Sequence, residues 1–252
     1  MPYRFRMCGR ATVVNPDGIV EKVYGFTSKF VPSDWKPRYN LSPKSEIPVV
    51  YYDPFLRQRT LRLMHWNLIP SRLTSRRDIA EFDAGYSTFN ARIETVATAP
   101  TFRDAWRSQR CLVVVDGIIE WVGKKLYKTP HLIRRKDSAS FSMAGLWDRW
   151  HGKTENDEVW SCTVIVRDAD EWYKPFHDRM AALLPTTVYD DWLDPDRREG
   201  QHHLLDSRYA KESELEFYPI STLVNNVRND SPECLRRGSV LQDPQADLFA
   251  QA

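Results

Sequence analysis

The feature that most constrains the fold is a series of short apolar runs, most of them bounded by Gly, Pro, Asp or Asn. Such punctuation is typical of β-strands. We predict strands at Ile47–Tyr52, Thr60–Trp66, Cys111–Val115, Ile118–Val122, Leu126–Arg134, Ser140–Trp147, Ser161–Val166 and Met180–Leu184. Helical periodicity is confined to Asp17–Tyr24, Pro100–Gln109, Thr186–Leu193 and Gln201–Tyr209. Many short strands and few helices indicate an α+β fold, mainly antiparallel, with a curved or barrel-like sheet and several short peripheral helices.

The 252 residues contain no internal repeat and no Gly/Ser linker, so we predict a single domain. A chain of this length buries enough surface to fold without disulfides or metal. We expect the domain to cover residues 8–238 and residues 239–252 to form a flexible tail. No apolar run approaches the ~20 residues of a membrane span, and the N-terminus lacks the apolar segment of a secretory signal.

The four cysteines lie far apart and form no C-x-x-C pair, which argues against a zinc cluster or a disulfide framework. We therefore expect no metal and no cofactor. A reducing compartment follows, and we expect a cytoplasmic protein associated with the nucleoid. No heptad pattern or large amphipathic face suggests more than a monomer.

Charge is balanced overall but uneven along the chain. Lysine and arginine total 36 against 34 acids, a net charge of +2. Yet the segment 57–77 carries six arginines and no acid. That stretch is compatible with a nucleic-acid footprint, although a charge run is more often a solvated face. Nine tryptophans provide core packing or base-stacking surfaces.

Few residues are candidates for chemistry. Asn90, Arg92 and Glu94 share one face if the segment is extended; they could hold an anionic ligand, but spacing alone favours an exposed polar face. Glu120 lies within the apolar run 111–122, where a carboxylate is either outward-facing or partly buried with a raised pKa suited to acid–base catalysis. A lone histidine such as His177 is more often structural than catalytic.

The remaining histidines show no metal-ligand spacing, and we assign them no role. They are His65, His131, His151, His202 and His203.

Eight short motifs follow one another along nearly the whole chain. They are Met7-Cys8-Gly9-Arg10, Pro37-Arg38-Tyr39-Asn40, Trp66-Asn67-Leu68-Ile69-Pro70, Asn90-Ala91-Arg92-Ile93-Glu94, Arg110-Cys111-Leu112, Gly117-Ile118-Ile119-Glu120-Trp121, His177-Asp178-Arg179-Met180 and Val224-Asn225-Asn226. In their sequence and order they resemble the SOS-response-associated peptidase (SRAP) family, whose members crosslink covalently to abasic sites in single-stranded DNA. The resemblance spans about Met7 to Leu235.

This resemblance implies a specific chemistry. An N-terminal cysteine, here Cys8, condenses through its α-amine with the aldehyde of an abasic site, and its thiol closes a thiazolidine ring. Glu120 is implied as the acid–base group that helps to open the sugar ring. His177 is implied to assist proton transfer, and Asn90 to orient the aldehyde or Schiff base.

The same resemblance implies contacts with single-stranded DNA carrying abasic sites. Arg10 and Arg92 would hold flanking phosphates, as guanidinium groups do, and binding would weaken with salt. The further DNA contacts implied are Trp66, Arg72, Pro37 and Asn40.

Three positions depart from the family pattern. Cys8 follows seven residues, so an internal cysteine has an amide where the chemistry needs an amine. Residues 1–7 are then a leader that is cut off, a start codon assigned too early, or a sign that the position is chemically inactive. Ser71-Arg72 stands where the family has a tryptophan, so Arg72 could substitute through a cation–π or phosphate contact. Ala181 replaces a proline.

Two alternatives stay open. The chain could be a peptidase that uses Cys8 as an N-terminal nucleophile, either on peptide bonds in general or only on its own. It could also bind single-stranded DNA without catalysis. The arginine-rich segment 57–77 favours DNA over a general peptidase.

Overall fold

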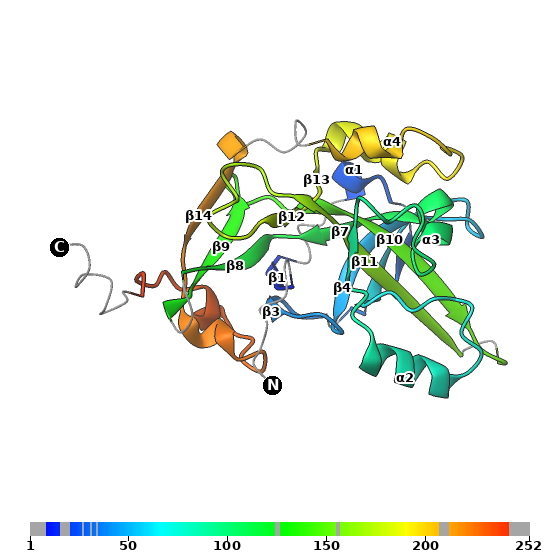
Figure 1. The fold of residues 1–252 in the computed structure, drawn as a ribbon, viewed down its shortest axis with the longest axis horizontal. Helices are drawn as coiled ribbons and strands as arrows, with labels where there is room; N and C mark the ends of the chain where they lie inside the picture. Colours follow the sequence, from blue (N-terminus) through cyan, green and yellow to red (C-terminus); the bar gives the residue numbers. More distant parts are fainter. Residues whose placement is uncertain are drawn as a thin grey trace.

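The computed structural model describes residues 9–15, 21–26, 28–30, 32–33, 35–123, 127–154, 157–206 and 212–241. Within them the chain forms two sheets with short helices around them (Figure 1). The strands are β1 Ala11–Val13, β2 Ser28–Phe30, β3 Arg38–Leu41, β4 Glu46–Asp53, β5 Gln58–Trp66, β6 Asn90–Arg92, β7 Arg110–Val115, β8 Gly117–Val122, β9 Thr129–Arg135, β10 Phe141–His151, β11 Glu158–Asp168, β12 Arg179–Ala181, β13 Leu183–Leu184 and β14 Leu215–Pro219. The α-helices are α1 Glu21–Tyr24, α2 Arg76–Gly85, α3 Arg103–Ser108 and α4 Tyr189–Leu193.

The larger sheet closes on itself. Its strand order is β12-β11-β10-β7-β4-β5-β2, and β11 also pairs with β5, which makes a five-stranded barrel of β4, β5, β7, β10 and β11. The closing contact is parallel, with Ser161 opposite His65 and Cys162 opposite Trp66. The other barrel pairs are antiparallel.

The barrel interior is filled by side chains. Val113 and the sulfur of Cys111 leave no room for a side chain on Gly145 of β10, where an added Cβ would lie 2.8 Å from Val113 and 3.0 Å from that sulfur. Burial raises the pKa of the Cys162 thiol above its ordinary range, because the thiolate would lose its hydration. The interior cysteines therefore act as small apolar residues.

The smaller sheet has the order β14-β9-β8-β1-β3 and extends to the left of the barrel in Figure 1. Ile118 and Ile133, a cross-strand pair on one of its faces, belong to the main core. The opposite face, with Ile119 and Leu132, packs against the C-terminal segment around Val224. Both faces of β8 are therefore buried over residues 117–120, which explains the apolar sequence around Glu120.

The expected α+β fold with a barrel-like, mainly antiparallel sheet is confirmed, and all eight predicted strand runs overlap observed strands. The helix predicted at Thr186–Leu193 is observed as a 3₁₀ turn followed by α4. The other helical predictions were less accurate. The helix expected from Pro100 begins at Arg103, and the segment expected from Gln201 is a 3₁₀ helix that ends at Leu205. In the helix expected at 17–24, residues 17–20 lie outside the described residues.

The longest helix, α2, was not predicted. Its N-terminus is capped by Ser75, whose hydroxyl accepts the N–H of Asp78 at 3.1 Å. Ile79 is its one buried residue. A helix with so narrow an apolar face lacks the periodicity that identifies helices in a sequence. No helix in the described part of the chain is long and apolar enough to cross a membrane.

Candidate active site

Glu120 occupies the face of β8 that points toward the barrel. Its side chain is 5% exposed. In the β8–β9 pair it stands directly opposite His131, so the two side chains project from the same face of the sheet. A carboxylate in this position is sheltered from water by the strands on either side.

The loop between β11 and β12 covers this face. The hydroxyl of Tyr173 donates to Oε1 of Glu120 at 3.0 Å. The ring of Phe176 meets that of His131 edge-on, with 5.7 Å between centroids, and packs on Phe217 of β14 at 5.1 Å. The barrel sheet thus supplies the loop and the smaller sheet supplies Glu120, so the site lies between the two sheets.

Arg167 shapes the start of this loop. Its guanidinium donates to both carboxylate oxygens of Asp170, at 2.9 and 2.7 Å. The carbonyl of Asp170 then accepts the N–H of Tyr173 at 2.9 Å. Because Arg167 is 8% exposed, this bidentate pair is shielded from solvent and orders the turn that presents Tyr173.

His177, half-buried at the end of the loop, is oriented by its neighbour. Its Nδ1 accepts the backbone N–H of Arg179 at 3.1 Å. Burial, which disfavours the charged ring, lowers the pKa of His177; Asp178 opposes this effect, and Lys128 and Arg179 add to it. The ring is therefore neutral near pH 7.

His131 was given no role from the sequence, yet it lies in this site. It is 9% exposed, and its Nδ1 donates to the carbonyl of Thr129 at 3.0 Å. Burial also lowers its pKa. A correct alignment of the two strands would have identified His131. When Ile118 pairs with Ile133 and Ile119 with Leu132, residue 131 lies opposite Glu120.

Asn90 and Arg92 lie on β6, which runs parallel to the end of β11. Asn90 is half-buried and Arg92 is exposed. Glu94 does not continue the strand; it lies in the following turn, where both carboxylate oxygens accept from Arg179, at 2.6 and 2.8 Å. This ion pair, which lowers the pKa of Glu94, ties β6 to the start of β12 near His177.

The side chain of Arg10 lies on the opposite face of the smaller sheet, beside Trp121 of β8. Its Nη1 donates to Oδ1 of Asn40 and to the carbonyl of Val224, each at 2.6 Å, and its guanidinium lies 5.4 Å from the ring centre of Trp121. Burial lowers the pKa of Arg10. In this structure Arg10 holds the C-terminal segment against the sheet, and phosphate binding by Arg10 stays a prediction.

Two of the predicted DNA contacts have buried side chains in this structure. Asn40 is 2% exposed, and its amide donates to the carbonyls of Asn226 and Asn229 at 3.1 and 2.7 Å. Trp66 is 1% exposed, and its indole N–H donates to the carbonyl of Phe89 at 3.1 Å. Both side chains are turned toward internal partners, and their contact with DNA stays a prediction.

Arg72 and Pro37 are exposed and remain available as DNA contacts. Arg72 donates to the carbonyl of Pro100 at 3.2 Å. Cys8, the predicted nucleophile, lies outside the described residues.

The arginine-rich segment does not form one basic surface. Arg59 pairs with Asp190, Arg76 with Asp157 and Arg77 with Glu81. These residues belong to β5 and α2, and each is matched by an acid from another part of the fold or of its own helix. The segment therefore gives less support to a nucleic-acid footprint than its sequence suggests.

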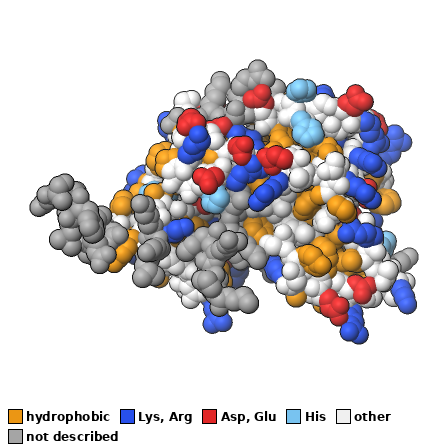
Figure 2. Space-filling view, in the orientation of Figure 1, with side chains coloured by type: hydrophobic (Ala, Val, Ile, Leu, Met, Phe, Trp, Pro, Cys, Tyr) orange, Lys and Arg blue, Asp and Glu red, His pale blue; other side chains and the backbone are white. Residues whose placement is uncertain are grey.

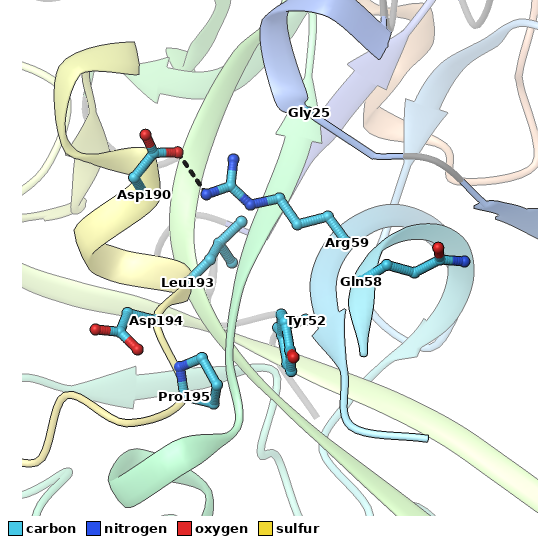
Figure 3. A pocket seen from close by; sticks show the side chains of 8 residues that line it. All are labelled: Gly25, Tyr52, Gln58, Arg59, Asp190, Leu193, Asp194 and Pro195. Carbon is cyan, nitrogen blue, oxygen red and sulfur yellow. Dashed lines mark hydrogen bonds and ion pairs between the residues drawn. The ribbon is translucent and has the colours of Figure 1, made fainter. Parts of the chain in front are cut away.

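A shallow hollow of about 420 Å³ lies between α4 and the β4–β5 hairpin (Figure 3). The Arg59–Asp190 ion pair crosses it, with Tyr52 and Pro195 beside it. None of the predicted site residues lines this hollow. Among the described residues, no group of three histidine, cysteine or acidic side chains is arranged to hold a metal.

Comparison with known proteins defines the class. The family model described as SOS response associated peptidase (SRAP) matches residues 7–227. The chain belongs to this family. It is 31% identical to the abasic site processing protein YoqW of Bacillus subtilis, over 91% of this chain and 99% of that protein. It is 30% identical to the abasic site processing protein HMCES of Xenopus tropicalis, over 91% of this chain and 78% of that protein.

A solved structure of a Bacteroides thetaiotaomicron protein shares the fold. The TM-score is 0.77 at 24% identity, and the match covers 92% of this chain and 100% of that one.

Proposed function

We propose that this chain recognises abasic sites in single-stranded DNA and forms a covalent thiazolidine crosslink through Cys8. Relatives that are 30% and 31% identical to this chain are named abasic site processing proteins. The observation that carries the proposal is Glu120, a buried carboxylate hydrogen-bonded to Tyr173 beneath the same loop that holds His177. A sheltered acid–base group with an oriented imidazole nearby suits carbonyl chemistry.

The crosslink would form in two steps. The α-amine of Cys8 attacks the aldehyde carbon of the ring-opened abasic site, and the carbinolamine loses water to give a Schiff base. The thiol sulfur then bonds to the imine carbon while its proton passes to the nitrogen, which closes the five-membered ring. Neither step needs an oxidant or a metal, since atoms and charge balance within protein, lesion and water.

The surrounding residues take distinct roles in this proposal. Glu120 moves the protons that open the sugar ring and dehydrate the carbinolamine. His177 donates a hydrogen bond from Nε2, because its Nδ1 is occupied by the N–H of Arg179. Asn90 orients the aldehyde, and Arg92 meets a flanking phosphate. The reaction would take place in the cytoplasm, at the nucleoid.

This chemistry requires Cys8 to be the first residue of the active protein. An internal cysteine has no free amine and cannot close the ring. We therefore propose that translation from Met7 with methionine removal, or cleavage after Met7, exposes Cys8. Intact mass spectrometry of the protein isolated from cells measures which residue comes first.

The decisive experiment incubates the protein, produced with Cys8 at its N-terminus, with an abasic single strand. We expect a heat-stable adduct on a denaturing gel. Cys8→Ala removes the thiol and should abolish the thiazolidine, whereas Cys234→Ala, which changes a buried free cysteine, should leave the yield unchanged. An undiminished adduct from Cys8→Ala would overturn the proposal.

The peptidase alternative makes a different prediction. A Cys8-dependent cleavage of peptides by protein that forms no DNA adduct would favour a peptidase. Binding of single-stranded DNA with neither reaction would favour a non-catalytic binder.

A further inference from the structure

A row of alternating aromatic rings and guanidinium groups crosses one end of the barrel. The guanidinium of Arg62 lies between Phe30 and Trp160, with ring-centre distances of 4.3 and 4.2 Å. The guanidinium of Arg149 lies between Trp160 and Phe55, at 5.0 and 5.2 Å. We refer to these five residues as the ring–guanidinium row. They come from β2, the β4–β5 turn, β5, β10 and β11, so only the closed barrel brings them together.

The centre of the row is rigid. Trp160 stacks on Trp147, with 5.4 Å between centroids and 23° between planes. Nε of Arg62 donates to the hydroxyl of Tyr51 at 3.3 Å, and Nε of Arg149 donates to Glu158 at 2.8 Å. The positive groups are thus held in place before any ligand arrives, which lowers the entropic cost of binding.

The two ends of the row are open to solvent. Phe55 is 74% exposed and Phe30 is 46% exposed. The turn that carries Phe55 is ordered by Asp53, whose Oδ1 accepts the N–H of Phe55 at 2.9 Å and that of Leu56 at 3.1 Å. A large ring that is held outward by its own turn contributes little to folding and is available to a partner. Arg57, also exposed, follows in the same turn.

We propose that the ring–guanidinium row is a second contact for single-stranded DNA, separate from the site at Glu120. Bases stack on exposed aromatic faces, and Arg62, together with Arg57 in the adjoining turn, meets phosphates along the same surface. Arg149 is ion-paired with Glu158 and positions the rings on either side of it. A purely apolar protein partner would gain nothing from a cation at every second position of the row. The inference rests on the proposed function for its choice of ligand.

The row lies at the opposite end of the molecule from the candidate active site. In Figure 1 the β4–β5 turn and the free end of the β10–β11 hairpin lie at the right, whereas β8 and β9 lie at the left. Along the same right-hand edge, Figure 2 shows arginine and lysine side chains interspersed with hydrophobic ones. A strand that is crosslinked at one end could therefore be held at the other.

Fluorescence anisotropy with intact oligonucleotides of about 8 and about 25 nucleotides tests the proposal, since one single-strand site covers about 4–16 nucleotides. The wild-type protein should bind the long strand more tightly than the short one. Phe55→Ala should weaken binding of the long strand by roughly fivefold to a hundredfold, the loss of one base–aromatic stack. Binding of the short strand should not change. Leu56→Ala is the matched control, because it removes an exposed apolar neighbour (45% exposed) that is outside the row.

Arg57→Asn tests the phosphate contribution, because asparagine tolerates the positive φ of 52° at this position. It should reduce the dependence of long-strand affinity on salt by about one phosphate contact. The proposal is overturned if the wild-type protein gains no affinity with length, or if Phe55→Ala weakens the short and long strands equally. Crosslinking of a short abasic strand by Phe55→Ala should match that of the wild type. If no variant crosslinks at all, the proposed function fails, but the length dependence still decides whether the row binds DNA.

Discussion

His131 and His177 are held in opposite tautomers. Nδ1 of His131 faces the carbonyl of Thr129 at 3.0 Å, so it must carry its hydrogen. Nδ1 of His177 accepts the N–H of Arg179 at 3.1 Å, so a neutral His177 carries its hydrogen on Nε2. His131 can gain a proton at Nε2 and keep its hydrogen bond, whereas a proton on Nδ1 of His177 would break one.

This arrangement predicts distinct NMR signals. Long-range ¹H–¹⁵N spectra at pH 7.5 should show His131 protonated on Nδ1 and His177 protonated on Nε2. Assignment follows from His131→Phe and His177→Asn, each of which removes one set of signals. Finding both rings in the same tautomer would contradict the hydrogen bonds described above.

Acid should destabilise the protein through both histidines. Burial lowers the pKa of each ring below its unfolded value of about 6.5, so the unfolded chain binds more protons between the folded and the unfolded pKa. The free energy of unfolding should therefore fall as the pH drops below about 6.5. Urea unfolding at several pH values measures this, and His131→Phe, which keeps an aromatic ring against Phe176, should reduce the loss.

Glu120→Gln should slow adduct formation without weakening DNA binding, because glutamine keeps the shape but cannot transfer a proton. General acid–base groups typically contribute 10²–10⁴-fold, so we expect a loss of about 10²-fold or more in rate. Rates are measured on gels under single-turnover conditions, and affinity by gel shift with an intact strand. If affinity collapses together with the rate, Glu120 is a structural residue.

Tyr173→Phe removes the hydroxyl that donates to Glu120 and leaves the ring in place. A hydrogen bond to a charged group contributes about 1.5–3 kcal/mol, and its loss disfavours the carboxylate. The single-turnover rate of adduct formation at neutral pH should therefore fall. Tyr86→Phe, a change on an exposed ring outside the site, is the control and should leave the rate unchanged.

Trp66→Ala should destabilise the fold by about 3–5 kcal/mol, as expected for a large ring removed from a core. Trp66→Phe should cost less and should leave DNA affinity at the wild-type value in protein that is still folded. Chemical denaturation and anisotropy measure the two effects separately. If folded Trp66→Phe binds DNA more weakly than the wild type, Trp66 is part of the DNA-binding surface.

Much of the fold could be predicted because the long strands are buried on both faces and read as apolar runs. Short strands such as β1 and β6 carry too few residues for a pattern, and α2 has too narrow an apolar face. The arginine-rich segment does not form one basic surface, because alternation along β5 sends Arg59 and Arg62 to opposite faces. Glu120 was identified as a candidate from its apolar surroundings, but its partner Tyr173 comes from a loop 53 positions away in the chain, a contact that no local pattern encodes.

Because the site depends on β11, it can assemble only at a late stage of protein synthesis. Glu120 leaves the ribosome well before the loop that covers it, and that loop is positioned by a strand whose pairing with β5 closes the barrel. β14, which supplies Phe217 beneath Phe176, is made later still. A nascent chain therefore leaves this carboxylate uncovered until synthesis is nearly complete, and the site is complete only in finished molecules.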